Sequence, residues 1–154
     1  MKPILFLLFP LILTILGCSN TKISSSIIAK QGILGIVTET RGNQMPMKGA
    51  PQKMTKIIQC TVLVYEPTTI SDTEPNETAA FYTAIHTKQI AAVDTDSTGE
   101  FKVNLPIGKY SLFIKMGDRF YANLYDQFNH IALFEVLPNG YTTANLKLIR
   151  SATY

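Results

Sequence analysis

Few side chains in this chain of 154 residues are suited to nucleophilic, acid–base or metal-binding chemistry. It contains two cysteines, Cys18 and Cys60, and two histidines, His86 and His130. The histidines are 44 positions apart, and neither lies at a spacing typical of a metal site. Motifs of serine, cysteine and phosphate-binding enzymes are missing from the sequence. We therefore predict no catalytic residue, no metal site and no cofactor, and we expect that the chain is not an enzyme.

The first 17 residues have the composition of a secretory signal peptide. Lys2 is their one charged residue, and Leu, Ile and Phe dominate residues 4–16, with Pro10 among them. This run of 13 residues is shorter than the roughly 20 apolar residues of a membrane-spanning helix. A basic start, a short apolar middle and a small residue at the end are typical of a cleaved export signal. We expect residues 1–17 to be absent from the mature protein.

The tetrad Ile15-Leu16-Gly17-Cys18 resembles a bacterial lipobox. In lipoproteins the cysteine thiol takes a diacylglycerol, the peptide is cut before that cysteine, and the new amine can take a third chain. Two or more acyl chains hold a protein stably on a bilayer. The resemblance therefore implies lipid attachment at Cys18 and a membrane as the first partner. The alternative is a plain signal peptide followed by an incidental cysteine.

Acylation of Cys18 would leave Cys60 without a partner for an internal disulfide. Cys60 lies in the predicted strand 57–65, on the same face as Val62 and Val64. A reactive thiol needs a neighbouring histidine or a helix N-terminus, and the sequence places neither beside it. We predict that Cys60 is a small, buried hydrophobic residue.

From about residue 32, short alternating runs are separated by Gly, Pro, Asn and Asp, which is typical of an all-β domain. The predicted strands are 34–40, 57–65, 78–87, 88–94, 101–105, 110–116, 119–125, 131–137 and 141–149. Residues 78–87 are also compatible with a helical turn at their start. Alternation in 101–105 and 110–116 predicts strands buried on one face. We expect an antiparallel β-sandwich of about seven strands, with a barrel as the alternative.

The domain organisation follows from these changes of composition. Residues 1–17 form the signal peptide, residues 18–31 a polar, flexible tether, and residues 32–154 the β-domain. Residues 42–55 contain prolines, methionines and lysines without periodicity, so we predict a long loop or insertion there.

An aromatic cluster lies in residues 120–128, with Asp118, Arg119, Asn123 and Asp126 between or beside its rings. Such a mixture can form a surface that binds carbohydrate or protein. The alternative is ordinary core on one strand face and half-exposed tyrosines on the other. The two histidines also have a simple structural interpretation. We predict that His86 lies on a solvated strand face and that His130 lies in a turn, where it is either structural or exposed.

The segment Asp94-Thr95-Asp96-Ser97-Thr98-Gly99-Glu100 spaces its carboxylates as a calcium loop does. It is too short for the twelve-residue calcium loop, because strand alternation resumes at Phe101. We predict a hairpin turn closed by Asp and Ser side chains, with Gly99 at positive φ.

Several elements together resemble the carboxypeptidase regulatory-like domain. They are Gly35-Ile36-Val37, Gly42-Asn43-Gln44-Met45-Pro46, Thr95 to Phe101, and Leu105-Pro106-Ile107-Gly108-Lys109-Tyr110. The resemblance covers most of residues 32–149 and is also shared with small exported proteins of Bacteroidetes-type bacteria. It implies a transthyretin-like, Ig-like sandwich that is not itself catalytic. The segment from Met47 to Lys56 departs from the family, which often passes quickly from the proline into its second strand.

These observations favour a lipid-anchored protein of the cell envelope that binds a protein or glycan partner. Two alternatives are an accessory lipoprotein of an envelope secretion or assembly machine and a hydrolase of unrecognised type. The net charge of +3 is too small to indicate a nucleic-acid partner. Ser19 after the cysteine resembles an outer-membrane sorting context, and residues 19–26 contain no acidic residue of the kind that resembles surface-export signals in Bacteroidetes. We therefore expect an outer-membrane anchor with the domain facing the periplasm.

Overall fold

The computed structural model describes residues 30–41, 54–77 and 80–150. The predicted signal peptide, Cys18, nearly all of the tether and most of the predicted loop 42–55 lie outside these residues. Within the described part the helical content is η1 (Ile70–Asp72), a single 3-10 turn. None of the described residues belongs to a helix long and apolar enough to cross a membrane.

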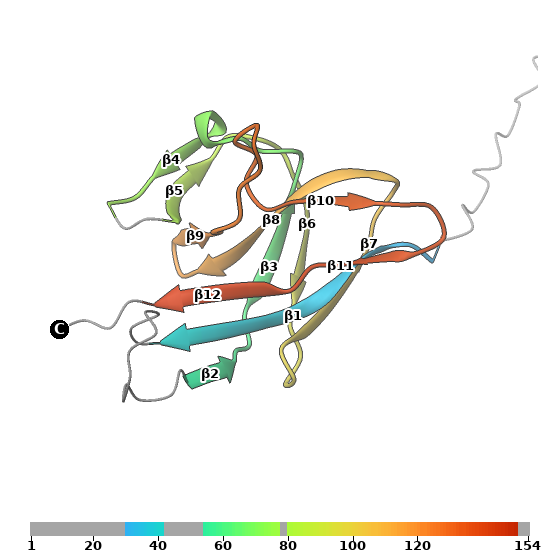
Figure 1. Cartoon of the computed structure of the whole chain (residues 1–154), viewed down its shortest axis with the longest axis horizontal. Helices are drawn as coiled ribbons and strands as arrows, with labels where there is room; N and C mark the ends of the chain where they lie inside the picture. The colour runs from blue at the N-terminus through green and yellow to red at the C-terminus, as the bar shows by residue number, and fades with distance from the viewer. Residues whose placement is uncertain (1–29, 42–53, 78–79, 151–154) are drawn as a thin grey trace, which may run out of the picture.

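The first sheet is built around β1 (Gly32–Arg41), the longest described strand (Figure 1). On one side, β11 (Tyr141–Thr143) and β12 (Leu146–Arg150) pair in parallel with successive halves of β1. On the other side, β7 (Glu100–Asn104) and β2 (Met54–Ile57) pair with it in antiparallel fashion. The sandwich is therefore not wholly antiparallel, because its last two strands run alongside its first.

The second sheet has the order β4-β5-β9-β8-β3-β6, and β10 pairs with the first half of β8. Its strands are β3 (Thr61–Tyr65), β4 (Thr73–Pro75), β5 (Phe81–Ile85), β6 (Gln89–Asp94), β8 (Gly108–Met116), β9 (Arg119–Tyr121) and β10 (Leu133–Val136). The described chain thus has more and shorter strands than the seven expected, since β9 ends at Tyr121 and the predicted strand 141–149 divides into β11 and β12.

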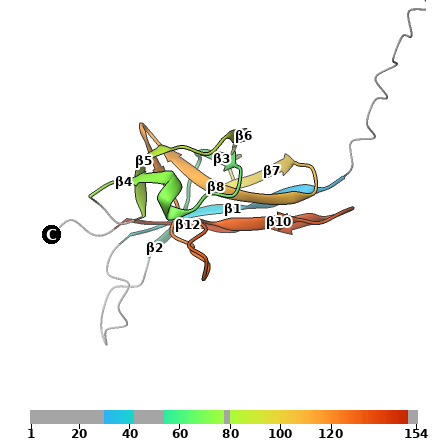
Figure 2. The same cartoon turned by 90° about the horizontal axis from the view of Figure 1, so that it is seen from above.

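The two sheets pack face to face, with β8 and β3 over β1 and β12 (Figure 2). Alternate residues of strands from both sheets fill the space between them. The buried members of this core are Ile33, Val37, Val62, Val64, Phe101, Leu105, Tyr110, Leu112, Ile114, Tyr121, Val136, Ala144, Leu146 and Leu148. The predicted all-β sandwich is confirmed.

A second apolar cluster covers the outer face of the second sheet. Phe113 is fully buried there, with Tyr65 and Tyr82 in edge-to-face contact at ring-centroid distances of 5.6 and 5.9 Å. Ile131, from the chain between β9 and β10, is also fully buried in this cluster. The prediction that strand 110–116 is buried on one face alone is therefore wrong, because a distant segment covers its other face.

The predicted strand 57–65 is divided by a crossing between sheets. β2 pairs with β1 in the first sheet, whereas β3 pairs with β6 and β8 in the second. Residues 58–60 make the connection and are not in a strand. The face assignment nevertheless holds, since Cys60 packs partly buried against the same core as Val62 and Val64.

The turn predicted at residues 94–100 is present, but it does not close a hairpin. β6 pairs with β3 and β7 pairs with β1, so this turn passes from one sheet to the other. Asp96 Oδ1 accepts hydrogen bonds from the Thr98 amide (2.8 Å), the Thr98 hydroxyl (2.7 Å) and the Glu100 amide (2.9 Å). Gly99 has φ +73°, which confirms its predicted backbone conformation.

The chain enters the sandwich at Gln31, one residue before the predicted domain boundary. Gln31 is buried, and its carbonyl accepts a hydrogen bond of 3.3 Å from the Leu105 amide. Its side-chain Oε1 accepts another of 3.2 Å from the Asn139 amide. Gln31 therefore belongs to the folded domain and joins two turns at the same end of the molecule.

Candidate functional site

The strongest candidate site is the segment between β9 and β10, residues 122–132, which we call the aromatic loop. Leu124, Tyr125 and Phe128 are 46%, 49% and 67% exposed. Isolated exposed apolar residues are common on proteins, but three within five positions form a patch. The patch is therefore the part of the predicted aromatic cluster that is available to a partner.

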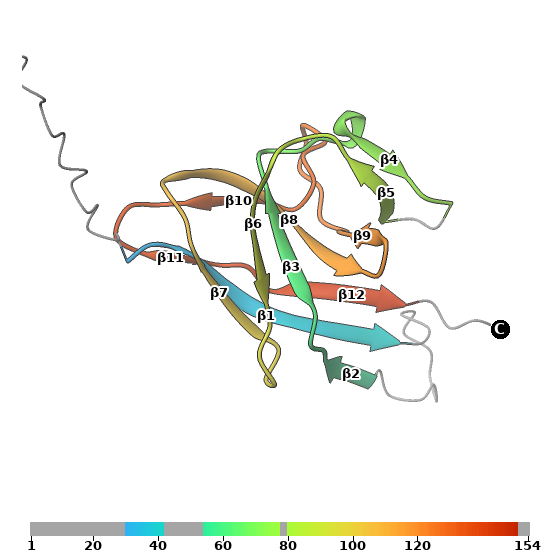
Figure 3. The same cartoon turned by 180° about the vertical axis from the view of Figure 1, so that it is seen from behind.

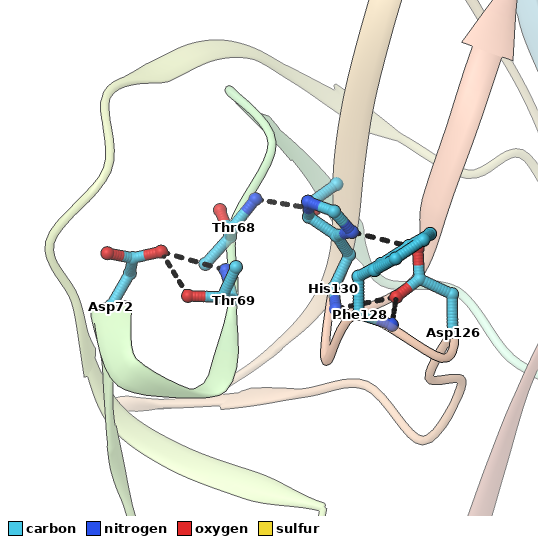
Figure 4. A network of polar contacts seen from close by, with 7 residues as sticks. Thr68, Thr69, Asp72, Asp126, Phe128 and His130 are labelled. Atoms are coloured by element: carbon cyan, nitrogen blue, oxygen red, sulfur yellow. Dashed lines mark hydrogen bonds and ion pairs between the residues drawn. The ribbon is translucent and has the colours of Figure 1, made fainter.

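Asp126 braces the aromatic loop from within (Figure 4). Its Oδ1 accepts hydrogen bonds from the amides of Phe128 (2.8 Å) and His130 (2.9 Å), and its Oδ2 lies 2.8 Å from His130 Nδ1. Desolvation opposes ionisation of Asp126, but these hydrogen bonds together lower its pKa. The exposed ring of Phe128 thus projects from an ordered turn.

The segment 68–72 supports the aromatic loop from the side (Figure 4). The Ile131 amide donates to the Thr68 carbonyl at 2.8 Å, and the Ile70 amide donates to the Asn129 carbonyl at 3.1 Å. Asp72 in turn accepts hydrogen bonds from the amide (2.9 Å) and hydroxyl (2.6 Å) of Thr69, whose hydroxyl bond is the main cause of the lowered pKa of Asp72. Two loops distant in sequence are therefore joined into one rigid surface.

Tyr125 is tied to the sheet beneath by its hydroxyl group. It shares a hydrogen bond of 2.6 Å with the hydroxyl of the buried Tyr82, and burial together with this bond raises the pKa of Tyr82. One edge of the Tyr125 ring is therefore fixed, while about half of the side chain remains open to solvent.

The other members of the predicted aromatic cluster lie elsewhere. Tyr121 is 3% exposed and belongs to the main core, and Phe120 is half-buried beside the second cluster. Asp118 is in the β8–β9 turn, and Arg119 places its guanidinium 5.3 Å from the centre of the Phe81 ring. The core interpretation of the cluster is thus confirmed for Tyr121, while the exposed members of the cluster lie in the aromatic loop.

Chemically, the aromatic loop can stack and hydrogen-bond. Exposed Tyr and Phe rings offer flat apolar faces, and the neighbouring side chains of Asn123, Gln127 and Asn129 carry amide groups. This combination suits the apolar face of a sugar ring or an apolar side chain of a protein partner. His130 has a structural role in the loop, which is one of the two roles predicted for it.

A second candidate site is an open groove of about 810 Å³, which lies where β1, β2, β8 and β12 end. Arg41, Lys56, Lys115 and Arg150 line it around the buried Glu39. Arg41 Nη2 is 3.1 Å from Glu39 Oε2, and Arg150 Nε is 2.7 Å from Glu39 Oε1 without the alignment of a hydrogen bond. Two of the four cations therefore already face a carboxylate of the protein.

Cys60 also lines this groove, but its surroundings do not activate the thiol. Burial raises the pKa of Cys60, and the nearby Asp94 adds to the rise, while a hydrogen bond from Thr95 acts in the opposite direction. A nucleophilic cysteine needs a lowered pKa. Cys60 packs against the core as predicted, but it is half-buried and not fully buried, because one side of it lines the groove.

The remaining candidate residues do not converge on one place. His86 is exposed, as predicted, but it follows the end of β5 and does not lie on a strand face, and its Nε2 lies 3.4 Å from Glu74 Oε1. Asp94 accepts a hydrogen bond of 2.6 Å from the Thr61 hydroxyl, while Asp96 closes its own turn. Among the residues that the structure describes, no three His, Cys, Asp or Glu side chains are placed to hold one metal ion.

Ile70 and Leu124 are two surface residues that sequence reasoning missed. Ile70 is 44% exposed in η1, and its amide donates to the aromatic loop at Asn129. Leu124 immediately precedes Tyr125 and is similarly exposed. No periodicity marks either residue, because their grouping depends on the contact between segments 68–72 and 122–132.

No protein-family model matches the chain, no curated protein matches it, and no solved structure matches it. The class that the structure itself defines is an all-β sandwich of two packed sheets.

Proposed function

We propose that this chain is a lipid-anchored protein of the bacterial cell envelope, whose non-catalytic β-sandwich binds a protein or glycan partner through the aromatic loop. The anchor is Cys18, and the sandwich is a divergent carboxypeptidase regulatory-like domain. The domain faces the periplasm from the outer membrane.

The observation that carries the binding role is the combination of exposure and order in the aromatic loop. Phe128 is the most exposed of the large apolar side chains in the described residues. Its turn is nevertheless fixed by three contacts to Asp126. A preorganised apolar side chain loses little conformational freedom on binding, so more of its contact energy contributes to affinity.

The anchor and orientation are supported by the sequence around Cys18 and by where the chain enters the fold. β1 begins at the end of the sandwich that carries the β10–β11 turn, and β10 separates that end from the aromatic loop (Figure 1). β10 has four residues, and its three residue steps correspond to about 10 Å in a strand. A domain held by its N-terminal side thus presents the aromatic loop away from its attachment.

The test is an affinity pull-down from detergent-solubilised envelopes with the full chain, tagged at its C-terminus, as bait. Phe128→Ser removes the central ring of the aromatic loop. Ile90→Ser is the matched control, because Ile90 is an exposed apolar residue (38%) on β6, outside the aromatic loop. Bound proteins and glycans are identified by mass spectrometry.

We expect one protein or glycan to be retained by the native chain and by Ile90→Ser, and its retention to be reduced about tenfold or more by Phe128→Ser. Equal retention by both variants, or no specific retention by the native chain, would contradict the proposed role of the loop.

A further inference from the structure

The end of the sandwich at which β1 begins carries an exposed apolar pair of its own. Ile107 is 61% exposed and Leu137 is 58% exposed. Gly108 and Val136 are partners in the β8–β10 ladder, so Ile107 and Leu137, which flank that pair, lie next to each other. We call these two residues, with the adjoining Pro106 and Pro138, the apolar tip.

The turns that form the apolar tip are fixed by contacts to the core. The Tyr110 hydroxyl donates a hydrogen bond of 3.1 Å to the Pro106 carbonyl, and Val136 and Leu105 are buried directly behind the tip. Gln31 joins the two turns through its hydrogen bonds to Leu105 and Asn139. The exposed side chains therefore project from a preformed surface.

The described chain begins at this same end, where β1 starts (Figure 3). The Gly32 amide donates to the Gly140 carbonyl at 3.1 Å, which places the start of β1 beside the β10–β11 turn. Twelve residue steps separate Lys30 from Cys18, and a chain of that length spans at most about 40 Å. An anchor at Cys18 would therefore hold the domain by the end that carries the apolar tip, within about 40 Å of the bilayer.

The charges at this end fit an anionic surface. Lys30 and Lys109 are exposed, and Glu135 faces Lys109 across the β8–β10 ladder. Two lysines against one glutamate leave an excess of positive charge beside the apolar pair. Apolar side chains flanked by lysines are typical of segments that insert into the headgroup region of a membrane.

We infer that the apolar tip is a second membrane contact, in which Ile107 and Leu137 insert into the interfacial region of the bilayer that holds Cys18. This inference rests on the proposed lipid anchor. It goes beyond that proposal, because a lipidated domain could equally remain clear of the membrane. The contact fixes the orientation of the sandwich and directs the aromatic loop away from the lipid.

The experiment uses the full chain purified in detergent and reconstituted into vesicles of phosphatidylethanolamine and phosphatidylglycerol. In a Cys60→Ala background, Ile107→Cys and Leu137→Cys each receive an environment-sensitive fluorophore. Phe128→Cys, labelled in the same way, is the matched control on the aromatic loop. Flotation, the emission maximum and quenching by brominated lipids are measured for each variant.

We expect all labelled chains to float with the vesicles, and the labels at 107 and 137 to show blue-shifted emission that brominated lipids quench. The label at 128 should keep its aqueous emission. A blue shift without lipid quenching would mean that a second copy covers the tip, and aqueous emission at both tip positions would mean that it touches nothing; either result overturns the inference alone. Chains that do not float would contradict the lipid anchor, and the tip contact with it.

Discussion

The carboxylate of Asp126 holds His130 at the base of the aromatic loop through the backbone and the ring at once. Oδ1 accepts the His130 amide at 2.9 Å while Oδ2 lies 2.8 Å from its Nδ1. This pair closes the turn from which Phe128 projects, and the residue that follows, Ile131, is fully buried. The most exposed ring of the candidate site is thus only three positions from its anchoring core residue.

Asp126→Ala should loosen the aromatic loop without unfolding the sandwich. The substitution leaves the Phe128 and His130 amides without their acceptor, so both should exchange with solvent deuterium about tenfold faster or more. Hydrogen exchange followed by NMR is the measurement. Asp118→Ala, in the exposed β8–β9 turn, is the control and should leave these two amides unchanged. Unaltered exchange in Asp126→Ala would contradict the bracing role.

Acid should have a similar effect on the loop. The pKa of Asp126 is lowered in the folded state, so its ionised form stabilises the fold at all pH values above the ordinary aspartate pKa of about 3.9. That contribution is lost as the pH falls through the lower folded value. We expect the Phe128 amide resonance to shift with a midpoint below pH 3.9. A midpoint at or above that pH would be inconsistent with the brace.

A comparison of Gly99→Ala with Gly117→Ala shows how much steric crowding adds to the cost of a strained backbone. Both have positive φ, +73° and +64°. A Cβ at Gly99 would lie 2.7 Å from Ile57 Cγ2 and 2.9 Å from the Val37 carbonyl oxygen, whereas a Cβ at Gly117 meets nothing within 4 Å. Gly117→Ala should cost about 1 kcal/mol and Gly99→Ala about 2–4 kcal/mol, measured by denaturant unfolding. Equal costs would show that the turn at 94–100 relaxes freely.

Arg150 should contribute more to stability than Arg41, although both face Glu39. Its Nε lies 2.7 Å from the buried carboxylate, against 3.1 Å for Arg41 Nη2, and its side chain is the less exposed of the two. Because each change removes one cation from a buried carboxylate, we expect Arg150→Gln to lower the free energy of unfolding by about 1–3 kcal/mol and Arg41→Gln by less than about 1 kcal/mol. The opposite ranking in denaturant unfolding would mean that Arg41 is the main partner of Glu39.

The fold class and the packing of Cys60 were predictable because they depend on local alternation. Cys60 lies on the same face as Val62 and Val64 in any extended conformation, even though the strand begins after it. The positive φ of Gly99 was also predictable, since the composition of the turn alone indicates it. Burial of Phe113 was not predictable, because the chain that covers it lies in segments distant in sequence.

The two candidate surfaces show the same limit of prediction from sequence. Tyr125 and Phe128 are close in sequence, so composition alone placed them in the predicted aromatic cluster. Ile107 and Leu137 become neighbours only through the register that pairs Gly108 with Val136. No local pattern contains that register, so the apolar tip could not be found from the sequence alone.

The identity of the mature N-terminus tests the account most directly, because the anchor decides where the domain is held and which end faces the lipid. Mass spectrometry of the membrane-extracted chain should find an N-terminal peptide that begins at Cys18 and carries the mass of a diacylglycerol and an added acyl chain. Cys18→Ser should move the protein out of the salt-washed membrane fraction. An unmodified Cys18, or a Cys18→Ser protein that still sediments with salt-washed membranes, would contradict the lipid anchor.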